Sequence, residues 1–339
     1  METWFWILGW SLSILTIAGN GFIIFLVYSK RQLRTKTNVF VVSLAVADFC
    51  VGMSVVPPMF FCEMATGCST KLNAWISFLR LLFSYASVMN LCSLVVDRYI
   101  AVVKPLKYLT FMTRRHVTQM VSVSWGIPIA IRIFVSLNSR VFKSPYFWDF
   151  LLWATVIFFE LLPCIILITN FVFMLQVVCK HERAARTRAK QLRYNHYRAS
   201  FKAQEKSAVK IMAVVISLFL LCYGFYIRCS FLYVFKKISV CDDKKYKIPI
   251  LILNSAINPV AYAFFKRDIR KEIKRRLCGT MVKQRNKLES IDDRVCHTNF
   301  ISWRVLFFKS AARITIFLIC LRWTGPRIKM CNRLYLSLS

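Results

Sequence analysis

Long apolar stretches alternate with short polar segments through the first 265 residues of the chain. The apolar stretches cover residues 4–28, 39–61, 75–96, 117–137, 147–178, 211–235 and 248–265. A helix needs roughly 17–25 mainly apolar residues to cross the hydrocarbon core of a bilayer, and each stretch supplies them. Because lipid offers the backbone no hydrogen-bond partner, only helices and closed barrels can span it. The pattern therefore predicts an all-α membrane protein, a seven-transmembrane helix bundle.

Lysine and arginine gather in every second connection between these stretches. The segment 30–36 carries four basic residues and no acid, and further basic clusters follow the third, fifth and seventh stretches. Cytoplasmic loops are enriched in basic residues, so we expect a multi-pass plasma-membrane protein with its amino terminus outside and its carboxyl terminus in the cytoplasm. The outer connection 236–247 is an exception with five lysines, although Asp242 and Asp243 offset part of that charge.

The composition agrees with a membrane protein and excludes a soluble domain. Hydrophobic residues make up 57% of the chain, and the mean hydropathy is +0.51. The net charge of +33 would also suit a nucleic-acid-binding protein, but such a protein would not divide its basic residues among the connections between apolar spans. We therefore expect this charge to contact membrane lipids and no nucleic acid.

The sequence offers no constellation of residues for catalysis. It contains no phosphate-binding loop, no paired nucleophile and base, and no metal-ligand spacing among its 13 cysteines and 4 histidines. Five of the cysteines, among them Cys50, Cys92, Cys164 and Cys222, lie inside apolar stretches, where they pack as small hydrophobic residues. The chain is therefore expected not to be an enzyme and to hold no metal centre.

Several polar side chains stand inside the apolar stretches, where hydrocarbon would exclude them unless they faced the interior of the bundle. They are Asn20, Asp48, Ser87, Asn90, Asn254, Ser255 and Asn258. We expect them to meet in one buried polar cluster. Two interpretations stay open, namely hydrogen bonding between helices alone, or a site where Asp48 and neutral oxygens bind a hard monovalent cation or a proton. Pro163 and Pro259 lie within spans and predict kinks.

The third apolar stretch carries two arginines, Arg80 and Arg98. They are 18 residues apart, which corresponds to five helical turns and about 27 Å of rise, so both lie on one face of the predicted helix. Because a charge is costly among lipid tails, this face is expected to point toward protein or water and to have a function.

The motifs on these stretches resemble those of the rhodopsin-like, class A G-protein-coupled receptors over about residues 4–278. In chain order they are Gly19-Asn20, the run 43–48, Asp97-Arg98-Tyr99, Trp125, Pro163, Phe219 with Cys222, and the run 258–262. Segments 89–92, 97–104 and 254–265 are most similar to the biogenic-amine branch, which includes trace-amine-type receptors. The resemblance implies a receptor that couples an extracellular small-molecule ligand to activation of a heterotrimeric G protein.

The resemblance also implies roles for individual residues. The G-protein switch would consist of Asp97, Arg98, Tyr99, Glu205 and Tyr262. A connector between the switch and the ligand pocket would consist of Val88, Pro163 and Phe219. An allosteric sodium site would consist of Asp48, Ser87, Asn254 and Asn258. In the switch, Asp97 and Glu205 would restrain Arg98 in the resting receptor. The alternative is that Glu205 only forms a surface ion pair with nearby lysines.

Several positions depart from the family pattern. Asn73 stands where a cysteine normally begins the third helix, so the usual bridge to the second outer loop cannot form. The outer candidates for a disulfide are Cys62, Cys68 and Cys241. In the sixth stretch, Tyr223 replaces a tryptophan and Phe225 replaces a proline, and in the fifth Phe171 replaces a tyrosine.

The ligand pocket departs most, because amine receptors place an aspartate where this chain has Arg80. The pocket is expected to include Arg80, Glu160, Tyr223 and Arg228, with Arg132 at a similar depth. In one interpretation Arg80 pairs with Glu160 and the other arginines reach toward the lipid headgroups. In the other, the pocket is net positive and binds a carboxylate or a phosphate, which a guanidinium recognises well.

The chain is expected to divide into a receptor domain at 1–278 and a poorly ordered cytoplasmic tail at 279–339. Residues 266–278 alternate apolar and basic positions, which is typical of an amphipathic eighth helix on the membrane surface, and Cys278 is a candidate lipidation site. Two alternatives to a signalling receptor stay open. One is a silent or degenerate receptor, and the other is a transporter or channel-like bundle, although internal repeats typical of transporters are not found.

Overall fold

Helices make up all the regular structure in the part of the chain that this computed structural model describes. The described residues are 3–64, 67–138, 144–173, 176, 220, 223–224, 244–265, 268–273 and 275–276. The helices are α1 (Thr3–Ser29), α2 (Lys36–Ser54), α3 (Val56–Met64), α4 (Thr70–Val103), α5 (Pro105–Phe111), α6 (Arg114–Leu137), α7 (Pro145–Val156) and α10 (Lys244–Phe265). A short 3-10 turn, η1 (Arg31–Leu33), follows α1, and a π-helical segment, η3 (Ile157–Leu161), follows α7.

The predicted apolar stretches are helical where the structure describes them. Among the described residues, five helices are long and apolar enough to cross a membrane: Thr3–Ser29, Lys36–Met64, Thr70–Ala101, Arg114–Leu137 and Pro145–Phe173. They confirm the first five predicted spans. Helix α10 covers the seventh with a shorter apolar core, Ile248–Val260. The sixth stretch, 211–235, lies outside the described residues except for Leu220, Tyr223 and Gly224.

Two spans are interrupted in ways that hydropathy does not predict. The second breaks at Val55, where α2 ends and α3 begins with Pro57 and Pro58 in its first turn. Prolines suit a first turn because its N–H groups have no partner inside the helix. The fifth span passes from α7 into η3, where the N–H of Leu162 donates to the carbonyl of Ile157 five residues back. This π-helical segment ends two residues before Pro163, so the helical hydrogen bonding changes close to the position where a proline kink is predicted.

Serine or threonine residues cap the start of four helices in the described part of the chain. Each side chain accepts a hydrogen bond from the backbone N–H three residues later, which satisfies a donor that the helix itself leaves unpaired. The four caps are Thr35, Ser69, Thr113 and Ser144. These residues follow short polar segments, so the boundaries of the spans are set by capping as well as by hydropathy.

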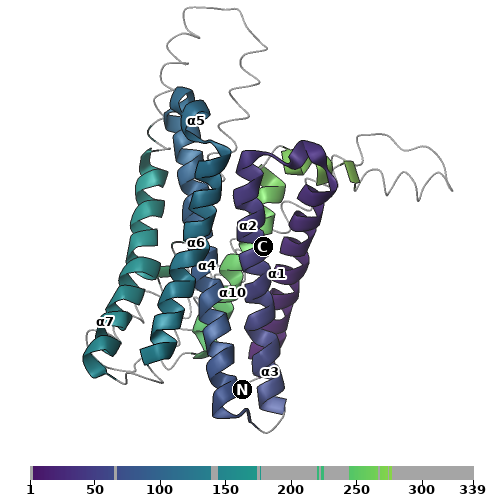
Figure 1. The fold of residues 1–339 in the computed structure, drawn as a ribbon. Coiled ribbons are helices and arrows are strands. Elements are labelled where there is room, and N and C mark those ends of the chain that lie inside the picture. The colour runs from purple at the N-terminus through teal and green to yellow at the C-terminus, as the bar shows by residue number, and fades with distance from the viewer. Residues whose placement is uncertain are drawn as a thin grey trace, which may run out of the picture. The chain divides into compact units, whose positions relative to one another are not determined.

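Helices α1, α2, α4 and α10 pack around a common core (Figure 1). Helix α2 contacts α1 and α4, α10 contacts α1 and α2, and α6 lies against α4. Two of these helix pairs pack closely at a glycine. A Cβ atom on Gly52 would lie 2.8 Å from Ile17, and one on Gly19 would lie 3.1 Å from Pro259. The glycine of the Gly19-Asn20 motif therefore stands where α10 passes close to α1.

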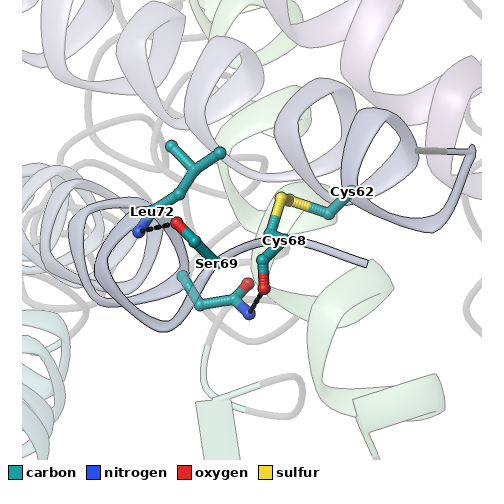
Figure 2. Close-up of a disulfide and its surroundings, with 5 residues drawn as sticks. Cys62, Cys68, Ser69 and Leu72 are labelled. Carbon is teal, nitrogen blue, oxygen red and sulfur yellow. Dashed lines mark hydrogen bonds between the residues drawn. A yellow bond between two sulfur atoms is a disulfide. The ribbon is translucent and has the colours of Figure 1, made fainter. Parts of the chain in front are cut away.

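A disulfide between Cys62 and Cys68 closes the loop between α3 and α4 (Figure 2). Within this loop Gly67 has a positive φ of 113°, a conformation that glycine adopts without the penalty of a side chain. The side chain of Asn73 donates to the carbonyl of Cys68 over 3.3 Å, so the residue that replaces the usual cysteine still binds this loop. Of the three predicted candidates, the third, Cys241, lies outside the described residues.

The chain after Ile269 forms a second compact unit, Arg270–Ser339. Residues 270–273 and 275–276 are its described part and are helical. There, Glu272 pairs with Arg275 at 2.7 Å and with Arg276 at 3.4 Å. The membrane-surface helix at 266–278 and the domain boundary at 278 stay predictions. Cys278 and the tail 279–339 lie outside the described residues.

The first prediction concerns the disulfide between Cys62 and Cys68. The Cys62→Ser/Cys68→Ser double variant should lose about 2 kcal/mol of unfolding free energy, because a bridge between residues this close in sequence removes only modest loop entropy from the unfolded chain. Thermal unfolding of the purified protein measures the loss, with Cys50→Ser, which removes a free thiol, as the control. Equal stability of the double variant and the wild type under oxidising conditions would contradict the prediction.

Candidate functional site

A buried carboxylate, Asp48, lies at the meeting point of three helices. The hydroxyl of Ser87 in α4 donates to its Oδ1 over 2.5 Å, and the side-chain amide of Asn258 in α10 donates to its Oδ2 over 2.7 Å. Ser255 of α10 also interacts with this carboxylate. The side chain of Asp48 is fully buried. The structure therefore brings together three of the four residues predicted for a sodium site.

The fourth residue, Asn254, supplies an oxygen that is not used within the described part of the chain. Its Oδ1 is buried and accepts no hydrogen bond there. Each oxygen of Asp48 accepts one of the two bonds just described and, as a carboxylate oxygen, can accept another. A carboxylate, a hydroxyl and an amide oxygen are the ligand types that hard cations prefer. The residues present thus fit a small monovalent cation.

The predicted polar cluster divides into separate networks. Asn20 of α1 donates to the carbonyl of Ser255 over 3.3 Å and to that of Thr16 over 2.9 Å, so it links α1 to α10. Asn90 belongs elsewhere, because its Oδ1 accepts the hydroxyl of Ser43 at 2.7 Å. The indole N–H of Trp125 in α6 donates to the same hydroxyl over 3.0 Å. One network thus surrounds Asp48, and another ties α2, α4 and α6 together.

The Asp97-Arg98-Tyr99 motif lies near the end of α4. The guanidinium Nε of Arg98 is 3.5 Å from Oδ2 of Asp97, and about a third of the Arg98 side chain is exposed. Tyr99 makes an edge-on contact with Phe173 of the fifth span, with 5.9 Å between ring centres. The predicted restraint of Arg98 by Asp97 is thus a single ion pair. Its other predicted partner, Glu205, lies outside the described residues.

Helix α5 adds a residue that the sequence pattern did not identify. The hydroxyl of Tyr108 donates to Oδ1 of Asp97 over 3.0 Å and lies 3.1 Å from the hydroxyl of Thr37 in α2. Burial is the main cause that raises the pKa of Tyr108 above its ordinary value of 10.0, so the hydroxyl remains a donor at neutral pH. Asp97 is therefore shared between the arginine beside it and a tyrosine of the next helix. The start of α5 at Pro105 is the one sequence signal of this arrangement.

The predicted connector is buried where the structure describes it. Val88 belongs to an apolar cluster that also contains Cys92, Val95, Leu167 and Tyr223. Pro163 is buried beside it in the fifth span, while Phe219 lies outside the described residues. Tyr262 is also buried, and its hydroxyl has no hydrogen-bond partner in the described part of the chain. The cluster thus links α4, the fifth span and the sixth.

The predicted ligand-pocket residues occupy two regions. Glu160 is buried in η3. The hydroxyl of Tyr223 donates to the backbone carbonyl of Phe159, the residue before Glu160 in the chain. The ring of Phe159 stacks on Tyr85 of α4 with 4.2 Å between centres. These two aromatic residues were not predicted as part of the site, because in sequence they are ordinary members of apolar runs.

Two of the arginines predicted at or near the ligand pocket contact residues of α3 and α4. Arg80 reaches the sulfur of Met59 in α3 at 4.0 Å. The guanidinium of Arg132 lies 5.4 Å from the centre of the Phe78 ring in α4, a cation–π contact. Arg228 lies outside the described residues. Arg80 thus lies on the first half of α4, and Arg132 of α6 contacts that same half.

A bundle of apolar helices that encloses a shared carboxylate, with an Asp-Arg-Tyr motif near the end of its third span, defines a multi-pass membrane protein of the receptor class. Residues 19–262 match the family described as 7 transmembrane receptor (rhodopsin family), and the chain belongs to this family of G-protein-coupled receptors. It is therefore a receptor and not an enzyme, as the sequence predicted.

Relatives of the chain include receptors named for amines. It is 29% identical over 338 residues to octopamine receptor beta-2R of Chilo suppressalis, and the match covers 83% of each chain. It is 29% identical to the histamine H2 receptor of Canis lupus familiaris, over 76% of this chain and 75% of that one. It is also 24% identical to adenosine receptor A2b of Canis lupus familiaris, over 77% and 85%. The predicted likeness to the amine branch is thereby confirmed.

The second prediction concerns Tyr108. Tyr108→Phe should lower the unfolding free energy by about 1–2 kcal/mol at pH 7, because a buried carboxylate loses a donor. The raised pKa of Tyr108 means that this stabilisation is present below pH 10.0, the ordinary tyrosine value, and is lost as the pH rises through the raised value. Thermal unfolding between pH 7 and pH 11 should therefore show the gap between wild type and variant narrowing.

Thr37→Val is the matched control for this experiment, because it removes the other partner of Tyr108 and leaves the bond to Asp97 in place. A loss of stability in Thr37→Val as large as in Tyr108→Phe would show that the bond to Asp97 is not the important one. A gap that widens above pH 10 would contradict the assigned donor role.

Proposed function

We propose that this receptor binds a small extracellular ligand among the outer halves of its helices and activates a heterotrimeric G protein at their cytoplasmic ends. The observation that supports the proposal best is the state of Arg98. Among the described residues it makes one ion pair, at 3.5 Å, and about a third of its side chain is exposed, so an incoming protein can reach it. Its partner Asp97 is fixed independently by Tyr108.

This function requires the orientation that the charge pattern predicts. The receptor would lie in the plasma membrane with its amino terminus outside, so that the end of α4 with Arg98 and the basic segment at 30–36 face the cytoplasm. Glu205 would be a second restraint on Arg98 at rest, and Tyr262 would turn toward the switch on activation. Exposed apolar side chains such as Ile14, Phe25 and Ile133 would contact the lipid.

The proposed ligand is an anion. Amine receptors hold the protonated amine with an aspartate, whereas this chain carries Arg80 at that place and Arg132 nearby. Arg80 lies on α4 beside α3, and Arg132 faces α4 across the α4–α6 contact. One acid at similar depth, the buried Glu160, does not balance these arginines and Arg228. A carboxylate or phosphate suits the guanidinium groups, which bind such anions through paired hydrogen bonds.

The third prediction tests this function and the charge of the ligand together. A carboxylate or phosphate compound that dissociates a G protein through the wild type should lose about 10- to 100-fold in potency on Arg80→Asp, because a charge-assisted contact is replaced by repulsion. Surface labelling ensures that receptors are compared at equal expression. Lys71→Asp, a charge reversal in the exposed first turn of α4, should leave the potency unchanged.

Several outcomes would contradict this assignment. An amine that activates the wild type and is unaffected by Arg80→Asp would show that the sign of the pocket is wrong. A lack of response from every G-protein subtype at normal surface expression would favour a silent receptor. Ligand-gated current in cells without functional G proteins would favour a channel or transporter.

We also propose that Asp48, Ser87, Asn254 and Asn258 bind an allosteric sodium ion. The support is the shared carboxylate of Asp48 together with the unused amide oxygen of Asn254. When bound, the ion would supply a positive charge that holds α2, α4 and α10 together in the resting conformation. Asp48 would supply the charged ligand, and Ser87 and Asn254 neutral oxygens.

The fourth prediction follows from this site. At a sodium concentration tenfold above the Kd, the ion should raise the unfolding free energy of the wild type by about 1.4 kcal/mol. Asp48→Asn should abolish this effect. The measurement is the shift in melting temperature when sodium replaces a large organic cation at constant ionic strength. Asp149→Asn, which removes an exposed carboxylate on α7, should keep the full shift. Equal shifts for all three proteins would rule out the site.

A further inference from the structure

The disulfide between Cys62 and Cys68 lies where a water-soluble molecule can reach it (Figure 2). Both cysteines are partly exposed, and Glu63 and Gly67 beside them are fully so. A Cβ atom built on Gly67 would meet nothing within 4 Å among the described residues, so the space next to Cys68 is open. Thiol–disulfide exchange requires a thiolate to reach one of the two sulfur atoms. This disulfide meets that requirement.

The free thiols in the described part of the chain are placed differently. Cys50, Cys92 and Cys164 lie inside three membrane-spanning stretches, and Cys92 is also buried. A charged, water-soluble thiol does not enter the hydrocarbon core of a bilayer. Among the described cysteines, such a reagent therefore meets the Cys62–Cys68 disulfide alone.

Hydrogen bonds keep the two ends of this loop together independently of the disulfide. The backbone N–H of Gly67 donates to the carbonyl of Cys62 over 3.0 Å. The side-chain amide of Asn73 donates to the carbonyl of Cys68 over 3.3 Å. Neither bond involves sulfur, so both can survive reduction. The two thiols then stay at a high effective concentration relative to each other, which favours renewed closure of the disulfide.

The disulfide also limits how far α3 can move from α4. Met59 and Cys62 are three residues apart on α3, so they share one face of that helix. The guanidinium of Arg80 in α4 reaches the sulfur of Met59 at 4.0 Å. The rest of α3 packs on α1 and α2, where Phe60 makes edge-on contacts with two tryptophans of α1. The disulfide joins the end of α3 to the segment that begins α4, and so it restrains Met59 beside Arg80.

We propose that Cys62 and Cys68 form a reversible exchange site for small water-soluble thiols, and that reduction of their disulfide lets α3 move relative to α4. The thiolate of the reagent attacks one sulfur and forms a mixed disulfide, while the other cysteine leaves as a thiolate and takes up a proton. A second reagent thiol attacks the reagent's own sulfur in the mixed disulfide and releases the remaining cysteine. Two electrons thus pass to the protein, and two reagent thiols become one disulfide.

The exchange would regulate the proposed ligand pocket, and this consequence rests on the proposed function. When α3 is free to move, Met59 no longer fixes the position of the Arg80 guanidinium. An anionic ligand would then have to order that side chain on binding, which lowers its affinity. The proposed orientation places the loop outside the cell, so the reagent would be an extracellular thiol.

The fifth prediction concerns the reactivity of the two cysteines. Receptors on intact cells, with Cys241→Ser to remove the other predicted outer cysteine, are treated with reduced glutathione. A membrane-impermeant maleimide then labels exposed thiols, and mass spectrometry measures the label on Cys62 and Cys68. Labelling of both should rise about tenfold, because a partly exposed disulfide exchanges with a thiol reagent, and should fall again when oxidised glutathione is added. As a control, Cys62→Ser should be labelled at Cys68 without any reductant.

The movement of α3 is measured on purified receptor. Spin labels carried by unnatural amino acids replace Phe61 of α3, which is 69% exposed, and Lys71 of α4, which is also exposed. Reduced glutathione should widen the distribution of distances between these labels about twofold, because opening the loop frees its two ends. Labels at Ile14 of α1 and Met53 of α2, two exposed positions outside the bridged loop, should keep their distribution. Thermal unfolding in glutathione checks that the receptor stays folded.

The results separate the possible errors. If glutathione leaves both cysteines unlabelled on cells and on purified receptor, the disulfide is not an exchange site. If labelling rises but the distances between the labels on α3 and α4 do not change, reduction does not move α3. If purified receptor reacts and receptor on cells does not, the exchange site stands and the proposed orientation is wrong. If both measurements succeed while Arg80→Asp leaves the potency of every anion unchanged, the exchange site stands and the proposed pocket is wrong.

Discussion

Lipid accepts no hydrogen bonds, and this constraint decides where polar groups of the receptor can lie. The Asp48 carboxylate can be buried because donors from α4 and α10 reach both of its oxygens. Asn20 is tolerated in α1 because it binds backbone carbonyls of α1 and α10. Each such group costs several kcal/mol if left unpaired, so the polar residues determine which helices are neighbours.

The same constraint explains what could be predicted from the sequence. A span needs only length and apolar composition, and the first five predicted spans are helices in the structure. The meeting of Asp48, Ser87 and Asn258 could be predicted because polar residues in membrane spans almost always face the interior of the bundle. The separation of Asn90 into a network with Ser43 and Trp125 could not be predicted, since it depends on how α4 is rotated against α2 and α6.

Other features depended on geometry that the sequence does not express. The break at Val55 and the π-helical turn at Ile157–Leu161 lie inside continuous apolar runs, where hydropathy is uniform. Cys62 was one of three candidates, and only the placement of α3 beside the start of α4 selects Cys68 as its partner. The hydrogen bond from Tyr108 to Asp97 requires α5 to fold back toward α4. The sequence of this seven-residue helix does not predict that direction.

The contacts weaken from Asp48 in the middle of the bundle to the proposed switch at Arg98, and this gradient suits a receptor. Asp48 is fully buried between donors from two neighbouring helices, so separating these helices would leave its buried carboxyl group without hydrogen-bond donors and cost several kcal/mol. Arg98 is partly exposed, and among the described residues it makes one ion pair, with Asp97 at 3.5 Å. This distance exceeds the roughly 2.7–2.9 Å of a strong charge-assisted hydrogen bond, and Asp97 keeps its hydrogen bond from Tyr108 when Arg98 leaves. A switch that is to be reversed by a ligand must differ between its states by no more than the ligand can supply. The long ion pair at Arg98 meets that condition, while the hydrogen bonds at Asp48 keep α2 in contact with α4 and α10.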